Sequence, residues 1–151
     1  MNMHKGAIVL SKNGKDVIEC EHCGFKHINP LPTDQELEQL YKYDYYSTEK
    51  PAYLSENTED NAWWSKIYIE RYKKLELLLN KSNNSILDIG SGPGYFLFEG
   101  KKRGWATKGL EPNIQAYEFS KNLGLDVENT FLSTSNKNSI NNFDVVNMEK
   151  F

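Results

Sequence analysis

The chain has 151 residues, of which 18 are Lys or Arg and 21 are Asp or Glu, giving a formal net charge of −3. This length suits an ordinary single domain, and the mildly acidic balance lacks the basic footprint of a protein that binds nucleic acid or an anionic membrane. No run reaches the roughly 20 apolar residues of a transmembrane helix, and the apolar run at residues 7–10 is shorter than the core of a secretory signal. We therefore expect a cytoplasmic protein that acts on small molecules.

Residues 1–32 contain all three histidines and both cysteines of the chain, and we predict that they form a small ribbon-like segment. A C-x-x-C pair can hold a zinc ion on a tight turn, but a closed tetrahedral site needs four ligands. The candidate ligands are two thiols and two imidazoles: Cys20, Cys23, His4 and His27. A metal-free turn with two thiols is the alternative interpretation, and His22 has no assigned role. A redox pair is disfavoured because such a C-x-x-C normally opens a helix.

Residues 33–82 are rich in aromatic and charged side chains and are predicted to be helical. Thr33 and Glu36 fit a capping box, in which each side chain takes up a backbone amide at the start of a helix. A longer amphipathic helix follows, because one face repeats at steps of three and four: Trp64, Ile67, Tyr68, Arg71, Tyr72, Leu75, Leu78 and Leu79. Three tyrosines between these helices either pack in the core or cover a ligand: Tyr45, Tyr46 and Tyr53.

Residues 83–151 alternate between strand and helix signals. Short apolar runs bounded by turn residues predict strands at residues 85–89, 106–110, 125–127 and 143–148. Helices are predicted at residues 95–102 and 114–122, each ended by a glycine. This alternation implies parallel strands joined by right-handed crossovers. The sequence therefore predicts an α/β, Rossmann-like domain at residues 83–151, preceded by the two smaller parts at 1–32 and 33–82.

Asp88 and the glycines Gly90, Gly92 and Gly94 lie between the first strand and the first helix of this domain. A glycine motif in this context builds a nucleotide-binding turn, because glycine permits positive φ and leaves room for a ligand. We expect the amides at the start of the helix to face that ligand. A pyrophosphate-binding fold uses G-x-G-x-x-G, whereas here Tyr95 takes the place of the last glycine. The carboxylate of Asp88 would repel a phosphate and suits an ammonium group.

Glu111 follows the second predicted strand, 19 residues after Gly92. Nucleotide-binding folds of this type place an acid about 20 residues on, where it accepts hydrogen bonds from the ribose hydroxyls. A charge-assisted hydrogen bond of this kind is worth roughly 1.5–3 kcal/mol, and an acid here disfavours the 2′-phosphate of NADP. We therefore predict that Glu111 holds the ribose of the ligand.

Taken together, these motifs resemble those of one enzyme family. L-D-I-G-S-G-P-G followed by G-L-E-P-N resembles motif I and the acidic loop of class I S-adenosylmethionine-dependent methyltransferases, and F-D-V-V at residues 143–146 resembles their fourth strand. The resemblance covers about residues 60–151 and implies S-adenosylmethionine as the cofactor. The residues it implies at the methionine part are Asp88, Gly90, Ser91, Gly92 and Gly94, with Asp88 supporting the amino group. Those it implies at the ribose, the adenine and the sulfonium end are Glu111, Pro112, Phe131, Leu132, Asn147 and Met148.

The amino-terminal part carries a second resemblance. C-x-x-C-G-F-x-x-x-N-P-x-P, at residues 20–32, resembles the amino-terminal region of a methyltransferase group that includes sugar C-methyltransferases. That group normally has a second C-x-x-C upstream, which is absent here, and His4 is the candidate in its place. The resemblance implies zinc as a second bound group and a sugar nucleotide or another metabolite as the methyl acceptor.

No catalytic residue is assigned from the sequence. No histidine follows His27, so the candidate general bases are tyrosines and Glu149. The family's sheet has seven strands and only four are predicted, so we expect a fragment that keeps the cofactor half-site but lacks turnover alone. Its open sheet edge could support self-association. An NAD-dependent oxidoreductase and a non-catalytic binding module are the alternative functions.

Overall fold

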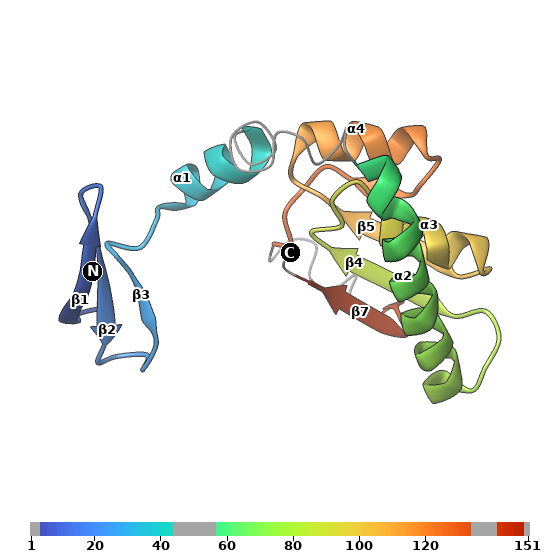
Figure 1. The fold of residues 1–151 in the computed structure, drawn as a ribbon, viewed down its shortest axis with the longest axis horizontal. Coiled ribbons are helices and arrows are strands. Elements are labelled where there is room, and N and C mark those ends of the chain that lie inside the picture. The colour runs from blue at the N-terminus through green and yellow to red at the C-terminus, as the bar shows by residue number, and fades with distance from the viewer. Residues whose placement is uncertain (1–3, 44–56, 134–141, 150–151) are drawn as a thin grey trace. The chain divides into compact units, whose positions relative to one another are not determined.

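The computed structural model describes residues 4–43, 57–133 and 142–149, without the side chains of residues 57–61. The chain divides into two compact units, Met1–Leu40 and Tyr41–Phe151, which are described separately (Figure 1). The finer division predicted from the sequence stays a prediction. Tyr45, Tyr46 and Tyr53 lie outside the described residues.

The first unit is a three-stranded antiparallel sheet followed by a short helix. Its strands β1 (Gly6–Lys12), β2 (Lys15–Cys20) and β3 (Lys26–Asn29) lie in the order β1-β2-β3. Asn13 and Gly14, with φ of 51° and 72°, form the turn between β1 and β2, because two positive φ angles match the twist of a tight hairpin. The predicted capping box is confirmed: Thr33 and Glu36 exchange hydrogen bonds and start helix α1 (Asp34–Gln39).

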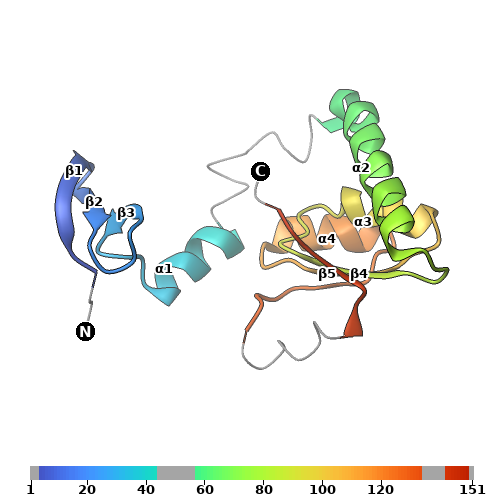
Figure 2. The same cartoon turned by 90° about the horizontal axis from the view of Figure 1, so that it is seen from below.

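The second unit is a parallel sheet with helices on one side. Strands β4 (Ser85–Ile89), β5 (Ala106–Leu110), β6 (Val127–Glu128) and β7 (Val145–Met148) lie in the order β6-β5-β4-β7. Helices α2 (Asn57–Leu79), α3 (Tyr95–Lys102) and α4 (Ile114–Asn122) lie on the same side of β4 and β5 (Figure 2). The predicted fold class, a Rossmann-like sheet of four parallel strands with a small amino-terminal sheet, is confirmed.

Two predicted strands differ from the observed strands in their limits. The strand predicted at residues 125–127 lies at Val127–Glu128, because the Leu125 amide donates to the Ser120 carbonyl and continues the end of α4. The strand predicted at 143–148 begins at Val145, because the Asp144 carboxylate accepts hydrogen bonds from the Ser85 amide and hydroxyl, both at 2.9 Å. A backbone hydrogen bond sets the first limit and a side-chain contact sets the second, and an apolar pattern encodes neither.

Helix α2 confirms most of the predicted apolar stripe. Tyr68 and Tyr72 are buried, and Leu75 and Leu79 pack against the same core. The prediction is wrong for Leu78, whose side chain is 81% exposed, because it lies roughly a quarter of a turn from the line through Leu75 and Leu79. Among the described residues we find no helix, α2 included, with the length and hydropathy of a membrane span.

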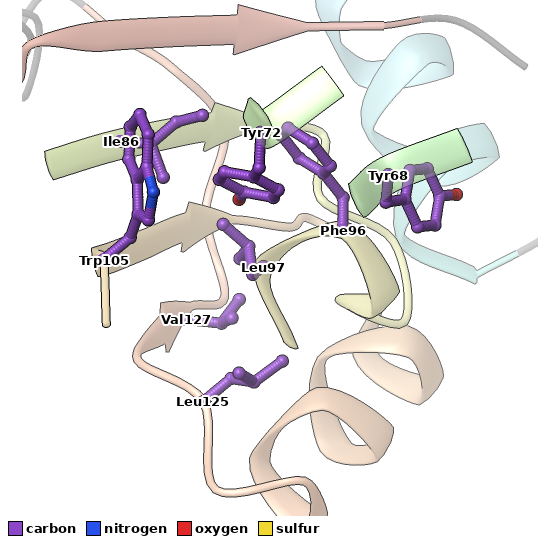
Figure 3. Close-up of a cluster of buried hydrophobic side chains, with 8 residues drawn as sticks. All are labelled: Tyr68, Tyr72, Ile86, Phe96, Leu97, Trp105, Leu125 and Val127. Carbon is purple, nitrogen blue, oxygen red and sulfur yellow. The ribbon is translucent and has the colours of Figure 1, made fainter. Parts of the chain in front are cut away.

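The core of the second unit is built on stacked aromatic rings. Tyr72 of α2 stacks on Phe96 of α3 with 4.7 Å between ring centroids, and it meets the edge of Trp105 at 5.0 Å (Figure 3). The other members come from α2, β4, α3 and the segment around β6: Tyr68, Ile86, Leu97, Leu125 and Val127. This packing fixes α2 against β4 and α3, and therefore fixes the position of Arg71, the residue before Tyr72.

We expect Tyr72→Phe to raise the free energy of unfolding by about 1–2 kcal/mol, because a buried hydroxyl without a partner costs roughly that much. The Tyr72 hydroxyl is buried and has no hydrogen-bond partner within the described part of the chain. Burial also raises the pKa of Tyr72 beyond its usual range, so the phenol stays neutral. Urea denaturation at neutral pH measures the effect, and a less stable variant would contradict the prediction.

Candidate functional site

The strand order indicates at which end of the parallel sheet a ligand would bind. The chain runs from β4 through β5 to β6 on one side of β4 and then returns to the other side as β7. In open α/β sheets, ligands bind outside the carboxyl ends of the strands at the point where the order reverses. Here that point lies between β4 and β7. The glycine loop leaves β4 at this end, as the sequence predicts.

The glycines of the loop all have positive φ, but the space beside Gly94 differs from that beside Gly90. Gly90, Gly92 and Gly94 adopt φ of 75°, 56° and 85°, values that other residues rarely adopt. A Cβ at Gly94 would lie 2.5 Å from Cδ1 of Leu125, so this glycine is required for packing. A Cβ at Gly90 would meet no atom within 4 Å. The loop therefore leaves open space beside Gly90, as a ligand site requires.

The backbone amides of the loop are already hydrogen-bonded within the protein. The amides of Gly90 and Ser91 donate to the Leu110 carbonyl at 2.8 and 3.1 Å, and that of Gly94 donates to the Ser91 carbonyl at 3.0 Å. The Gly92 amide donates to Oε2 of Glu111 at 2.7 Å, and residue 93 is a proline without an amide hydrogen. These four amides are therefore not available to a ligand, and the prediction that the amides at the start of α3 face the ligand stays a prediction. A pyrophosphate needs free backbone donors and would find none on Gly90, Ser91, Gly92 or Gly94.

Glu111 lies beside the glycine loop and not in solvent. Its side chain is buried, and its two oxygens accept hydrogen bonds from the amides of Gly92 and Asn113, each at 2.7 Å. Burial raises the pKa of Glu111, while these two hydrogen bonds oppose the rise. Because a carboxylate has about four acceptor positions, each oxygen can still accept one hydroxyl. The geometry is compatible with the predicted ribose contact.

Asp88 is the most deeply buried acid of the site, with 4% of its surface exposed. Its Oδ1 accepts a hydrogen bond from Asn147 Nδ2 at 2.7 Å, which joins the ends of β4 and β7. Burial raises the pKa of Asp88 to about 7; the negative charges of Glu149 and Glu111 add to the rise, while the Asn147 hydrogen bond and the charge of Arg71 oppose it. A cationic ligand group at Asp88 would replace lost solvation.

The loops that follow β5 and β6 are joined by hydrogen bonds. Asn129 Nδ2 donates to the carbonyls of Glu111 and Pro112, both at 2.9 Å, so the loops after β5 and β6 form one wall. The ring of Phe131 meets that of Tyr41 edge-on at 6.4 Å. Phe131 and Leu132 follow Asn129 closely in the chain, and their place at the adenine stays a prediction; the contact of Phe131 with Tyr41 was not predicted from the sequence.

Asn113 explains how Tyr41 reaches this wall. Its side-chain oxygen caps α4 by accepting from the amides of Gln115 and Ala116. Its Nδ2 donates to the carbonyls of Tyr41 and Lys42 at 3.3 and 3.1 Å. Asn113 is part of the quoted G-L-E-P-N motif but was assigned no role, and only the fold brings residue 41 to it.

Two predicted site residues direct their side chains elsewhere. The Ser91 hydroxyl is buried, has no hydrogen-bond partner among the described residues, and lies 2.6 Å from the place of a Cβ at Gly109. It therefore points towards β5. Met148 is 76% exposed, and it lies on the face of β7 opposite to Asn147 because successive strand residues alternate.

The first unit brings together the four predicted metal ligands. The ligand atoms of His4, Cys20, Cys23 and His27 all lie within 4.8 Å of one another. Cys20 Sγ is 3.4 Å from Nδ1 of His4, and both cysteines are free thiols. Burial works against a charged Cys20, but hydrogen bonds from the Cys23 and His22 backbone, together with the nearby imidazoles of His27 and His4, lower the pKa of this thiol to about 5.

His27 is oriented as a metal ligand would be. Its Nδ1 donates to the Ile28 carbonyl at 2.8 Å, which leaves Nε2 as the bare nitrogen. Nε2 is buried and has no hydrogen-bond partner among the described residues. Ligating histidines typically hold their second nitrogen in this way. The donor set of two thiolates and two imidazoles suits a tetrahedral zinc ion.

Comparison with known proteins bears on the fold. No family model and no curated protein matches the chain. Among solved structures, the plantazolicin methyltransferase BpumL in complex with SAH is 22% identical with a TM-score of 0.53, over 74% of this chain and 44% of that one. The chain shares the fold of a methyltransferase. The BpumL complex with a pentazolic desmethylPZN analog and SAH is 21% identical with a TM-score of 0.44, over 65% of this chain and 40% of that one. The chain thus spans less than half of the length of these structures.

Proposed function

We propose that this chain binds S-adenosylmethionine at the carboxyl ends of β4 and β5 and forms the cofactor half of a small-molecule methyltransferase. The observation that carries the proposal is the pairing of two buried acids, Asp88 and Glu111, with a glycine loop whose amides are engaged within the protein. Two carboxylates suit an ammonium group and a ribose. They disfavour a phosphate, which NAD would place at this loop.

The proposed cofactor-binding residues divide by the part of the cofactor that they meet. The aminoacyl end would lie at Asp88 and along the backbone of Gly90, Ser91, Gly92 and Gly94. The ribose would lie at Glu111, and the adenine at Pro112, Phe131 and Leu132, with Asn147 at the sulfonium end. When bound, the cofactor supplies an electrophilic methyl group for in-line transfer, and the residues of this chain orient it. SAH bound to BpumL, which has the same fold, supports this assignment.

Isothermal titration calorimetry of the 151-residue chain with SAH and with NADH tests the proposal. We expect heat of binding with SAH at one site per chain and none with NADH. If the chain binds NADH and not SAH, the alternative function, an NAD-dependent oxidoreductase, replaces this proposal. The acceptor class, a sugar nucleotide or another metabolite, is a further part of the proposal, and transfer of a labelled methyl group to a panel of such acceptors tests it separately.

We expect Gly90→Ala to weaken SAH binding by at least about tenfold, because its Cβ would occupy the open space at the loop and because alanine at positive φ costs roughly 1–2 kcal/mol. Gly104→Ala is the matched control, since Gly104 has φ of 83° and also meets no atom within 4 Å. Both variants should lose similar stability in thermal melts. Equal loss of SAH binding in both would show that backbone strain, and not the ligand space, explains the effect.

We also propose that the first unit holds one structural zinc ion through Cys20, Cys23, His4 and His27. Four protein ligands would leave no open coordination position, so the ion would supply stability and no chemistry on a substrate. It would join the segment before β1, the end of β2, the following turn and β3. The bare, buried Nε2 of His27 is the observation that favours a bound metal over a metal-free turn.

A further inference from the structure

An ion pair lies where β7 ends, close enough for both of its charges to act on Asp88. Arg71 of α2 faces Glu149, the residue that follows β7, and makes two contacts with its carboxylate; the Arg71 Nη2–Glu149 Oε1 distance is 2.7 Å. Both side chains are partly exposed, at 37% for Arg71 and 30% for Glu149. Parallel two-point contact of this kind is the geometry by which a guanidinium recognises a carboxylate.

Arg71 is also coupled to Asp88. The charge of Arg71 favours ionised Asp88, and the charge of Asp88 raises the pKa of Arg71, after the larger effects of the Glu149 hydrogen bonds and burial. The next residue, Tyr72, is fully buried in the aromatic core, so α2 cannot move freely at this point. Asp88 bonds to Asn147, and Arg71 bonds to Glu149 two residues further on, so the structure holds an anionic and a cationic group at the carboxyl ends of β4 and β7.

An aminoacyl group needs this combination of charges. Its ammonium has a partner in Asp88, but its carboxylate finds none in the glycine loop, because the amides there donate to Leu110, Glu111 and Ser91. We propose that Arg71 binds the α-carboxylate of the cofactor, and that Glu149 occupies the same guanidinium in the free protein. On binding, the α-carboxylate of the cofactor would replace the carboxylate of Glu149 at the Arg71 guanidinium. This inference rests on the proposed function and adds a binding residue and a competing group to it.

Three ligands that differ by one group each test this inference. SAH has the ammonium and the carboxylate, decarboxylated SAH has only the ammonium, and 5′-methylthioadenosine has neither. We expect Arg71→Gln to weaken the binding of SAH by about 10- to 100-fold, the range for a lost pair of charge-assisted hydrogen bonds. The affinities for decarboxylated SAH and 5′-methylthioadenosine should not change. Glu149→Gln should tighten SAH by about three- to tenfold, because its neutral amide competes less well for Arg71.

Arg103→Gln is the matched control. Arg103 makes a similar pair with Glu76, with Nε–Oε1 at 2.9 Å, but it lies before β5, at the opposite end of the sheet. It should change none of the three affinities. Unchanged 5′-methylthioadenosine binding shows that Arg71→Gln is folded. Equal weakening of all three ligands, or SAH binding at the wild-type level in this variant, would overturn the inference. If the wild-type chain binds none of the ligands, the proposed function fails first, and the inference with it.

Discussion

Removal of zinc is expected to unfold the amino-terminal sheet while the second unit stays folded. Among the described residues of Met1–Leu40, the only buried hydrophobic side chains are Ile18 and Cys20. Ile8, Leu10 and Phe25 are exposed. A unit of about 40 residues with so small a core normally needs a metal, disulfides or oligomerisation. Structural zinc contributes about 10–16 kcal/mol to small domains of this kind, far more than this core could supply.

Two histidine variants make the zinc prediction specific. His27→Ala removes a proposed ligand, whereas His22→Ala removes an imidazole whose ring lies 5.3 Å from that of His4 but which is outside the cluster. We expect His27→Ala to weaken zinc binding by at least about 100-fold, more than the usual loss of a partner that only orients a ligand. His22→Ala should bind one zinc per chain like the wild type. Cys20→Ser should abolish binding.

NMR distinguishes the effect of zinc removal on the first unit from its effect on the second unit. NMR amide dispersion of the first unit should collapse when a strong chelator is added, while the resonances of residues 57–133 stay in place. Visible absorption of the cobalt-substituted chain should report tetrahedral thiolate ligation in the wild type and in His22→Ala alone. A sheet that stays folded in excess chelator, or equal loss of affinity in both histidine variants, would contradict the zinc proposal.

The sequence predicted the elements around the glycine loop to the residue. Strands β4 and β5 and helices α3 and α4 have the predicted limits, because turn residues with positive φ, such as Gly104 and Gly124, end the helices locally. Asp88 and Glu111 could be placed at one edge of the sheet because parallel strands end at the same edge. The start of β7 depends on the contact of Asp144 with Ser85, 59 residues away, which no local pattern encodes.

The contacts that the sequence did not predict share a cause. Asn113 and Tyr41 meet across 72 residues, and Arg71 and Glu149 across 78. Local periodicity carries no information about such pairs. One signal was nevertheless present: Arg71 falls on the apolar stripe of the predicted helix, and a charged residue there needs a partner. The sequence therefore indicated that Arg71 has a role, but the identity of the partner required the fold.

We expect Asp88→Asn to make the protein more stable and a poorer ligand binder at pH 8. The buried carboxyl has a pKa of about 7, against 3.8 in an unfolded chain, so ionised Asp88 opposes folding by up to about 4 kcal/mol above pH 7. Asparagine removes the charge and can keep the hydrogen bond from Asn147. The same change removes the proposed partner of the cofactor's ammonium, so SAH should bind about 10- to 100-fold more weakly. Urea denaturation and calorimetry measure the two effects.

Asp144→Asn is the control of opposite sign, and pH distinguishes the two aspartates. The raised pKa of Asp88 means that its destabilising effect is full above pH 7 and fades as the pH falls towards about 4, because the folded state takes up the proton first. Hydrogen bonds from Lys81 and Ser85 lower the pKa of Asp144, so its stabilising effect is present above pH 3.8 and fades as the pH falls below it.

At pH 8 Asp88→Asn should therefore gain stability and Asp144→Asn lose it, and the gain of Asp88→Asn should shrink steadily between pH 7 and pH 4. A gain that does not change with pH would mean that packing, and not the buried charge, limits stability at Asp88. If Asp88→Asn loses SAH binding but gains no stability, the free protein already neutralises this carboxylate, and Asp88 carries no uncompensated charge that a cationic ligand could neutralise.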